Sequence, residues 1–140
     1  MSEWVVDASA AAKWFLNEPH AEPARRLLQL GQVLHAPDFF LLEMDNLFCK
    51  RIRRGDWTEE DAKEARARLR QIPVKTHAFP YLQDSAYALA VQSGRSIYDC
   101  LYLSLAIELR VPFVTADRRL YEGLAASPLA RRVLWVEDLA

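Results

Sequence analysis

Four acidic residues stand at places where one predicted element gives way to the next. Asp7 and Asp117 each follow a β-prone run, Asp99 lies at the start of an apolar segment, and Glu43 borders the apolar stripe of a predicted helix. Four carboxylates brought together would repel one another and lose hydration, so their cluster needs a bound cation, raised pKa values or both. Hard oxygen ligands favour Mg²⁺ or Mn²⁺.

The elements that must position these acids alternate between short strands and helices. Periodicity and turn residues predict strands at 4–6, 33–36, 74–76, 111–115 and 133–136, and helices at 8–16, 21–30, 38–54, 58–71, 81–93, 98–110 and 117–126. This alternation predicts an α/β fold in which helices cover both faces of a parallel sheet. The two helices that flank Gly55 are expected to form a hairpin.

The same elements predict that the four acids converge. Asp7 and Asp117 both fall at the carboxyl edge of the sheet, where ligands bind near the reversal of strand order. Asp99 opens a helix of about 12 residues at 1.5 Å each, and the strand of about 4 residues at 3.3 Å each that follows brings the chain back toward Asp117. Glu43 lies in the second turn of a helix that begins at this edge.

A structural explanation competes with the catalytic one at each acid. Asp7 and Asp117 are suitable N-caps for the helices that follow them, and capping explains such residues more often than catalysis does. Asp99 can complete a capping box opened by Ser96, and Glu43 can be a plain boundary residue. The case for a metal site therefore depends on all four acids together.

Size and charge limit the functions that the chain can have. Its 140 residues, with a net charge of -1, predict a single domain over residues 1–140 and exclude a polycation that coats nucleic acid through bulk charge. Basic residues gather on both arms of the hairpin, where they are usually just solvated. Arg118 and Arg119 adjoin Asp117 and are the better candidates for contact with a substrate.

Cysteine and histidine usage points to neither a disulfide scaffold nor a zinc site. Cys49 and Cys100 lie in apolar runs and are predicted to be core residues in a reducing compartment. His20, His35 and His77 lack metal-finger spacing and are expected on the surface or in loops. No apolar run is long enough to span a membrane, so we expect a cytoplasmic protein.

Four segments, taken in order, resemble a known family. Residues 5–10, 43–47, 98–106 and 115–120 are similar to the motifs of PIN domains, in particular VapC-like ribonuclease toxins of type II toxin–antitoxin systems. The resemblance covers nearly the whole chain. It implies a PIN-like three-layer α/β/α fold with a short-stranded, mostly parallel central sheet and a protruding helical hairpin.

The resemblance also implies roles for particular residues. The catalytic and metal-binding acids would be Asp7, Glu43, Asp99 and Asp117, supported by the polar side chains of Ser9 and Thr115. Met44 and Asp45 stand after Glu43 where the family usually reads Val-x, a departure that leaves the glutamate in place. Some relatives carry a further acid after the last motif, but two arginines follow Asp117 here.

The implied activity is hydrolysis of RNA without a covalent intermediate. The chain offers no plausible His, Cys or Ser nucleophile, which favours attack on a phosphodiester by water activated on Mg²⁺ or Mn²⁺. One carboxylate, Asp7 or Asp99, can hold or deprotonate that water, and the sequence does not choose between them. Single-stranded or looped RNA is the implied substrate, because base-specific recognition needs unstacked nucleotides.

The resemblance further implies two protein partners. VapC-like proteins bind a cognate antitoxin and are commonly homodimers. Aromatic residues are numerous around the first, third and fourth helices, and those left exposed would form a groove for an amphipathic helix of the antitoxin. They are Trp14, Phe15, Phe39, Phe48 and Trp57, most of which we expect in the core.

Three other functions fit part of the pattern. A phosphoacceptor signalling module also binds Mg²⁺ through clustered acids, but it needs a lysine late in the sheet, and Lys75 is the last lysine here. A phosphatase with an aspartate nucleophile needs a second Asp two residues on, where Ser9 stands. A PIN-like module that only binds a partner or RNA would not need all four acids.

Overall fold

The predicted strands form one sheet in the computed structural model, which describes residues 2–15 and 21–139. The strands lie in the order β3-β2-β1-β4-β5, and every neighbouring pair is parallel. Their bounds are β1 Ser2–Val6, β2 Gln32–Pro37, β3 Val74–His77, β4 Phe113–Thr115 and β5 Val133–Trp135. The prediction of a mostly parallel, short-stranded sheet is confirmed.

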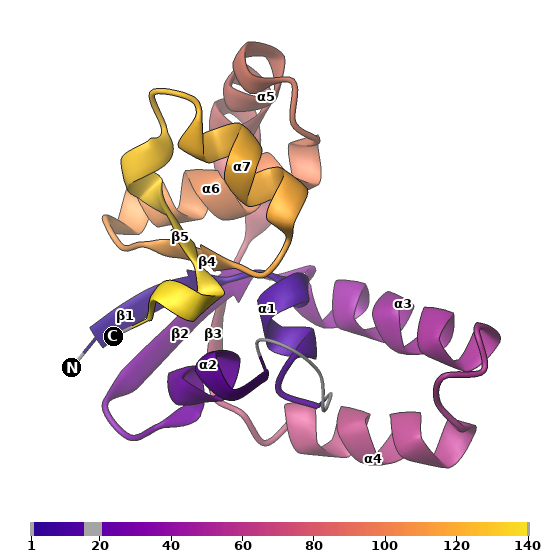
Figure 1. Ribbon diagram of the computed structural model, residues 1–140. Coiled ribbons are helices and arrows are strands. Elements are labelled where there is room, and N and C mark those ends of the chain that lie inside the picture. Colours follow the sequence, from indigo (N-terminus) through magenta and orange to yellow (C-terminus); the bar gives the residue numbers. More distant parts are fainter. Residues whose placement is uncertain (1, 16–20, 140) are drawn as a thin grey trace.

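The helices form two layers, one on each face of the sheet. They are α1 Ala8–Ala12, α2 Ala21–Arg25, α3 Phe40–Arg53, α4 Glu59–Leu69, α5 Gln83–Ser93, α6 Ile97–Leu109 and α7 Arg118–Ala125. The chain moves outward from β1 to β3, then crosses back to β4 and β5, and right-handed crossovers therefore place α1–α4 and α5–α7 on opposite faces. Figure 1 shows the sheet between these two groups, which confirms the α/β/α architecture.

Short 3₁₀ turns replace parts of two predicted helices, and a third predicted helix ends early. The helix predicted over 21–30 ends at Arg25 and continues only as a 3₁₀ turn, Arg26–Leu28. It stops early because Leu27 is buried while Leu28 and Leu30 face solvent, which leaves no apolar stripe to extend. A second 3₁₀ turn, Phe79–Leu82, precedes α5. The predicted first helix ends at Ala12, and residue 16, its predicted end, lies outside the described residues.

The core centres on α6, whose residues 100–106 are all buried. The prediction of a helix apolar on every side and enclosed by the protein is confirmed. Cys100 lies in this core as predicted, but the prediction for Cys49 is wrong, since Cys49 is exposed on α3. The buried stripe of α3 is Phe40, Met44 and Phe48, and one residue beyond Phe48 turns the side chain by about 100° out of the stripe.

The predicted hairpin is present as α3 and α4, which extend side by side away from the sheet (Figure 1). Trp57 stacks on Phe48 with ring centroids 5.5 Å apart at the turn. Asp45 of α3 accepts two hydrogen bonds from Arg66 of α4, at 2.7 and 3.1 Å. Aromatic packing at one end and a charged fork nearer the sheet therefore hold the two arms together.

His35 corrects a second prediction, because it is buried within the sheet. The side chain on β2 hydrogen-bonds Glu3 of β1 and His77 of β3, both at 2.9 Å. Polar rings can be buried in a sheet covered on both faces when each nitrogen has a partner. His20 lies outside the described residues. No helix among the described residues is long and apolar enough to cross a membrane.

Candidate active site

Asp7 lies at the point where the strand order reverses, between β1 and β4. Its carboxylate is buried and accepts hydrogen bonds from the Ala10 N–H at 2.9 Å and from the hydroxyls of Ser9 and Thr115, both at 2.6 Å. The Ala10 bond makes Asp7 the N-cap of α1. Capping uses only one of the three bonds, so the capping explanation accounts for part of this arrangement.

Ser9 and Thr115 also bind backbone groups that follow β4. The Ser9 hydroxyl accepts from the Ala116 N–H at 3.0 Å, and the Thr115 hydroxyl accepts from the Asp117 N–H at 3.1 Å. Their two hydroxyl oxygens lie 3.2 Å apart. These side chains, predicted to support the site, thus link the ends of β1 and β4 around the Asp7 carboxylate.

Burial governs the ionisation of Asp7. Desolvation raises the pKa of this carboxyl from 3.8 to about 6, against the hydrogen bonds from Ser9, Thr115 and Ala10, which lower it. The charge of Asp99 adds a smaller upward contribution. Burial therefore disfavours the charged form of Asp7. A cation bound beside the carboxylate would favour that form.

Asp99 and Asp117 reach the same edge from the start of α6 and the start of α7. The Asp99 N–H donates to the Ser96 hydroxyl at 3.1 Å, and Asp117 accepts from the Leu120 N–H at 3.2 Å as the N-cap of α7. Burial is the largest cause that raises the pKa of Asp99, the Ser96 hydroxyl opposes it, and the charge of Asp117 adds to it.

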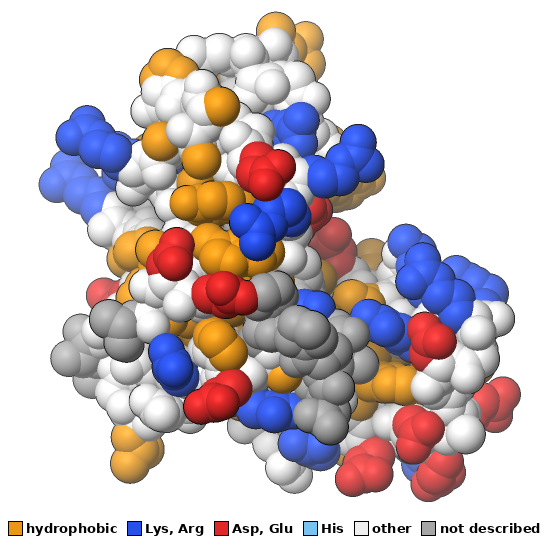
Figure 2. Space-filling model, in the orientation of Figure 1, with side chains coloured by type: hydrophobic (Ala, Val, Ile, Leu, Met, Phe, Trp, Pro, Cys, Tyr) orange, Lys and Arg blue, Asp and Glu red, His pale blue; other side chains and the backbone are white. Residues whose placement is uncertain are grey.

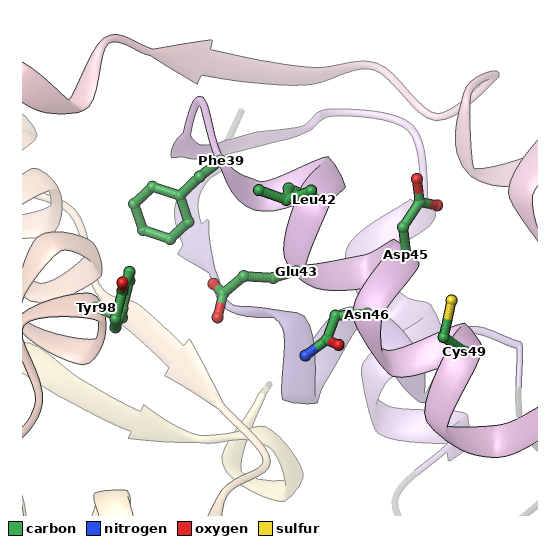
Figure 3. A pocket seen from close by; sticks show the side chains of 7 residues that line it. All are labelled: Phe39, Leu42, Glu43, Asp45, Asn46, Cys49 and Tyr98. Carbon is green, nitrogen blue, oxygen red and sulfur yellow. The ribbon is translucent and has the colours of Figure 1, made fainter. Parts of the chain in front are cut away.

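Glu43 approaches from the opposite layer, on α3. Its carboxylate accepts a 2.6 Å hydrogen bond from the Tyr102 hydroxyl, which belongs to α6. Burial raises the pKa of Glu43, the Tyr102 bond lowers it, and the charge of Asp99 raises it. Figure 3 shows this carboxylate projecting from α3 toward the start of α6, where Tyr98 lies.

The four acids form one electrostatic cluster centred on Asp99, whose charge interacts with those of Asp7, Glu43 and Asp117. Among residues 2–15 and 21–139, none of the four makes an ion pair with a lysine or arginine. No three acidic, histidine or cysteine side chains in those ranges already stand in a metal-binding arrangement. Side-chain rotation would therefore have to bring the carboxylates onto a shared ion.

Two residues of the site are absent from the sequence prediction. Tyr102 lies three positions after Asp99, and this i to i+3 spacing places both on one side of α6, a signal that the sequence contains. Arg95 packs against Gly123, where an added Cβ would lie 3.2 Å from the guanidinium carbon, and its charge lowers the pKa of Asp99. Only the packing of α7 against the turn between α5 and α6 reveals Arg95.

Arg118 and Arg119 lie at the start of α7, beside the acid cluster. The Arg118 guanidinium is 4.2 Å from the ring centroid of Trp135 and 4.0 Å from the Glu122 carboxylate, while more than half of its side chain is exposed. Arg119 is exposed, and its carbonyl accepts from Arg95 at 3.5 Å. Contact of either arginine with a substrate remains a prediction.

A pocket of about 600 Å³ opens beside Glu43, between the first turns of α3 and the start of α6. Its walls are formed by Phe39, Leu42, Glu43, Asp45, Asn46, Cys49 and Tyr98 (Figure 3). The pocket shares Glu43 with the acid cluster, so a ligand that occupies it lies next to the carboxylates.

Comparison with known proteins decides the family. Residues 4–123 match the family model of the PIN domain. The chain is a PIN domain protein. Within the PIN family it belongs with the VapC ribonucleases: Ribonuclease VapC3 of Pyrobaculum aerophilum is 34% identical over 124 residues, covering 87% of this chain and 95% of that protein. Ribonuclease VapC12 of Mycobacterium tuberculosis is 29% identical over 119 residues, covering 85% and 90%.

Solved structures share the PIN fold. PAE2754 from Pyrobaculum aerophilum superposes with a TM-score of 0.71 at 24% identity, over 99% of this chain and 86% of that one. VapC20 of Mycobacterium tuberculosis, described as a toxin that cleaves the sarcin–ricin loop, gives 0.61 at 20% identity over 85% and 93%. A toxin–antitoxin complex from Klebsiella pneumoniae gives 0.62 at 13% over 93% and 94%. These likenesses support the α/β/α fold alone.

Proposed function

We propose that this PIN domain is an endoribonuclease dependent on Mg²⁺ or Mn²⁺ that cleaves single-stranded or looped RNA and acts as the toxin of a toxin–antitoxin pair. The observation that carries the proposal is the cluster of Asp7, Glu43, Asp99 and Asp117, whose charges are linked through Asp99. The 34% identity of the chain to Ribonuclease VapC3 supports the assignment to RNA. That residues 1–140 form a single PIN domain is part of the same proposal.

The donor set fits a hard divalent cation. All four side chains offer carboxylate oxygens, which Mg²⁺ and Mn²⁺ prefer, and the pKa values of three of them are raised by burial. A positive ion would relieve the mutual repulsion that helps to raise those values. Asp7, Glu43, Asp99 and Asp117 would hold it. When bound, such an ion activates a water molecule and neutralises charge on the phosphate during in-line displacement.

The protein's own side chains would orient the reaction. Ser9, Thr115 and the Ala10 N–H fix both oxygens of Asp7, so this carboxylate is the most rigid of the four. Tyr102 fixes one oxygen of Glu43. These two positioned carboxylates, on opposite layers of the fold, would help to hold the ion. Arg95, Arg118 and Arg119 are the cations available to the flanking phosphates.

The central test is cleavage of RNA by the purified chain. Cleavage should require Mg²⁺ or Mn²⁺, cease on chelation, and fall at least a hundredfold in Asp99→Asn and Asp7→Asn variants whose circular dichroism is native. Mn²⁺ should also raise the melting temperature of the wild type and not of those variants, a readout independent of activity. Undiminished cleavage in both variants would refute the assignment of the site, and would favour another nuclease mechanism.

The toxin role is tested in cells. Expression of the chain without a partner should arrest growth, and Asp99→Asn at equal abundance should not. Equal toxicity of the two proteins would show that growth arrest does not depend on the acid cluster. We expect the active protein in the cytoplasm, where its RNA substrates are.

We also propose an antitoxin and a second copy of the chain as partners. Trp14 and Phe48 are in the core, while Phe15, Phe39 and Trp57 are only partly buried against it, so fewer of these five aromatic residues lie in the core than predicted. Phe15 and Trp57 line a pocket of about 290 Å³ near α4, with Arg68 over the Phe15 ring. This is the part of the predicted groove around α1, α3 and α4 where an antitoxin helix would bind. The homodimer is tested by sedimentation.

A further inference from the structure

The pocket beside Glu43 has the size of a site for one nucleoside. Its volume of about 600 Å³ lies within the 300–1,000 Å³ typical of small-ligand sites. It lies where α3 of one layer faces the start of α6 of the other. A chain of RNA that presents a phosphodiester to the acid cluster must place a neighbouring nucleotide close to this pocket.

Tyr98 forms an aromatic wall of the pocket and is 60% exposed. Its ring makes an edge-to-face contact with Phe39, at a centroid distance of 5.9 Å and an angle of 83°. Phe39 is in turn packed edge-to-face on Tyr102 at 5.5 Å. The ring is thus supported on one side by the core, while its exposure leaves room for a planar group to stack on it.

Asn46 supplies a polar group on the side of α3 that faces α6. It lies three residues after Glu43, and Figure 3 shows its amide and the Glu43 carboxylate projecting on the same side of the helix. Within the described ranges the amide makes no hydrogen bond. One amide carries both donors and an acceptor, the combination that reads the edge of a nucleobase.

Charge in the pocket also permits an anionic chain to pass. Asp45 is the second acid in its wall, and the guanidinium of Arg66 occupies both of its oxygens, at 2.7 and 3.1 Å. Glu43 then carries the remaining negative charge, at the end of the pocket that belongs to the acid cluster. A base inserted between Tyr98 and Asn46 leaves its sugar and phosphate room to extend toward Glu43, the residue that the pocket shares with the acid cluster.

We propose that this pocket binds one unpaired nucleobase of the RNA, stacked on Tyr98 and hydrogen-bonded by Asn46, and thereby sets which phosphodiester is cut. The proposal rests on the ribonuclease function proposed above. It assigns Tyr98, Asn46 and the supporting Phe39 to substrate binding and leaves the chemical step to the acids. The occupant is a nucleotide because the pocket shares Glu43 with the acid cluster, where the proposed function places the phosphodiester.

The test combines protein variants with RNA that lacks single bases. Cleavage of a short single-stranded RNA is first mapped with the wild type and Mn²⁺. Tyr98→Ala should raise KM by roughly 5- to 100-fold, as expected for the loss of one base stack, with kcat changed less than KM. Tyr98→Phe keeps the ring and should stay within about twofold of the wild type. Tyr87→Ala, which removes an exposed tyrosine from α5, is the matched control and should have no effect.

Abasic substitution locates the bound base. At one position beside the cut, removing the base should raise KM for the wild type and have little further effect on Tyr98→Ala, because both changes remove the same stack. Asn46→Ala should reduce the discrimination among the four bases at that same position.

Three results would overturn the proposal. One is an unchanged KM in Tyr98→Ala. Another is an increase in KM on base removal that is as large in Tyr98→Ala as in the wild type at every position, which would mean that Tyr98 stacks on none of the removed bases. A third is a variant that cleaves RNA normally but loses self-association or antitoxin binding, which would make the pocket a protein interface. Failure of the underlying function is separate and visible, since the wild type itself would then cleave no RNA.

Discussion

At the scale of single residues, the site holds carboxylates in place by hydrogen bonds, although burial disfavours their charged forms. The carboxylate of Asp7 is held by three hydrogen bonds and still has a raised pKa, because burial outweighs them. Glu43 owes its position to one tyrosine hydroxyl, donated from a helix on the other face of the sheet. The fold thus holds the Asp7 and Glu43 carboxylates in place, where a divalent ion would neutralise their negative charge.

The raised pKa of Asp7 predicts that the negative charge of this carboxylate lowers the stability of the metal-free folded protein. Between pH 3.8 and about 6 the folded chain binds a proton at Asp7 that the unfolded chain releases, so stability falls as the pH rises through this window. Asp7→Asn should therefore raise the free energy of unfolding at pH 7.5 by roughly 1 to 3 kcal/mol, and less at pH 4.5. Urea unfolding in EDTA measures both values.

The surface variant Asp138→Asn serves as the control for Asp7→Asn and should shift neither value. A loss of stability in Asp7→Asn at pH 7.5 would contradict the prediction, because it would mean that the hydrogen bonds to the carboxylate outweigh its desolvation.

Tyr102→Phe should weaken metal binding without altering the fold. Loss of the hydroxyl removes the bond that lowers the pKa of Glu43, so this pKa should rise further and its carboxylate should lose its fixed position. We expect a decrease in Mn²⁺ affinity of about tenfold, the size typical for a residue that orients a ligand. Isothermal titration at pH 6 and pH 8 should show the larger loss at pH 6. Tyr87→Phe, on α5, is the control, and equal affinities for the two variants would count against a positioning role.

At the scale of elements, local signals decide where each helix begins. The Thr58 hydroxyl accepts from the Asp61 N–H at 3.0 Å and the Asp61 carboxylate accepts from the Thr58 N–H at 2.9 Å, which together form a capping box at the start of α4. Helix ends are less predictable, because α1 ends at Ala12 and α2 at Arg25 although residues that favour helix follow both of them.

The capping box makes a prediction confined to the hairpin. Thr58→Ala should lower the free energy of unfolding by about 1 kcal/mol, since the Asp61 N–H loses its acceptor at the start of α4. Thr58→Ser keeps the acceptor and should be nearly neutral. The box lies far along the hairpin from the acids, so kcat for RNA should be unchanged in both, and a large loss of kcat would show that α4 takes part in the site.

At the scale of the whole molecule, the acid site lies at the edge of the sheet between β1 and β4, where the strand order reverses and both helix layers contribute side chains. Asp7 ends β1, Thr115 ends β4, α3 brings Glu43 from one face and α6 brings Asp99 from the other. Figure 2 shows acidic and basic side chains spread over this face with no single basic surface, as a net charge of -1 suggests. Binding of RNA should therefore depend on a few local contacts more than on long-range attraction.

The link between β1 and β4 can be tested through Thr115. Thr115→Val removes a donor to Asp7 and should raise the pKa of that carboxyl further. The free energy of unfolding should fall by roughly 1 to 3 kcal/mol at pH 7.5, and by less at pH 4.5, where Asp7 is protonated. Addition of Ser9→Ala should cost less than the sum of the separate changes, because the two hydroxyls share one carboxylate. Strict additivity, measured by urea unfolding, would show that the hydroxyls act independently.

The sequence by itself determined the order of elements, the two-faced parallel sheet and which four acids the structure brings into one electrostatic cluster. These follow from local chemistry: alternation of apolar residues, glycine at helix ends and acids that begin helices. It placed Ser9 and Thr115 beside Asp7 only through the family resemblance.

Only the tertiary structure decided which side chains touch. The bond from Tyr102 to Glu43 joins residues 59 positions apart, and Arg95 meets Gly123 only because α7 packs against the turn between α5 and α6. His35 is buried and Cys49 is exposed, against their sequence-based predictions, since burial depends on what covers a strand or helix and not on the apolar run around it. Contacts of this kind arise from strand order and packing, which local periodicity does not encode.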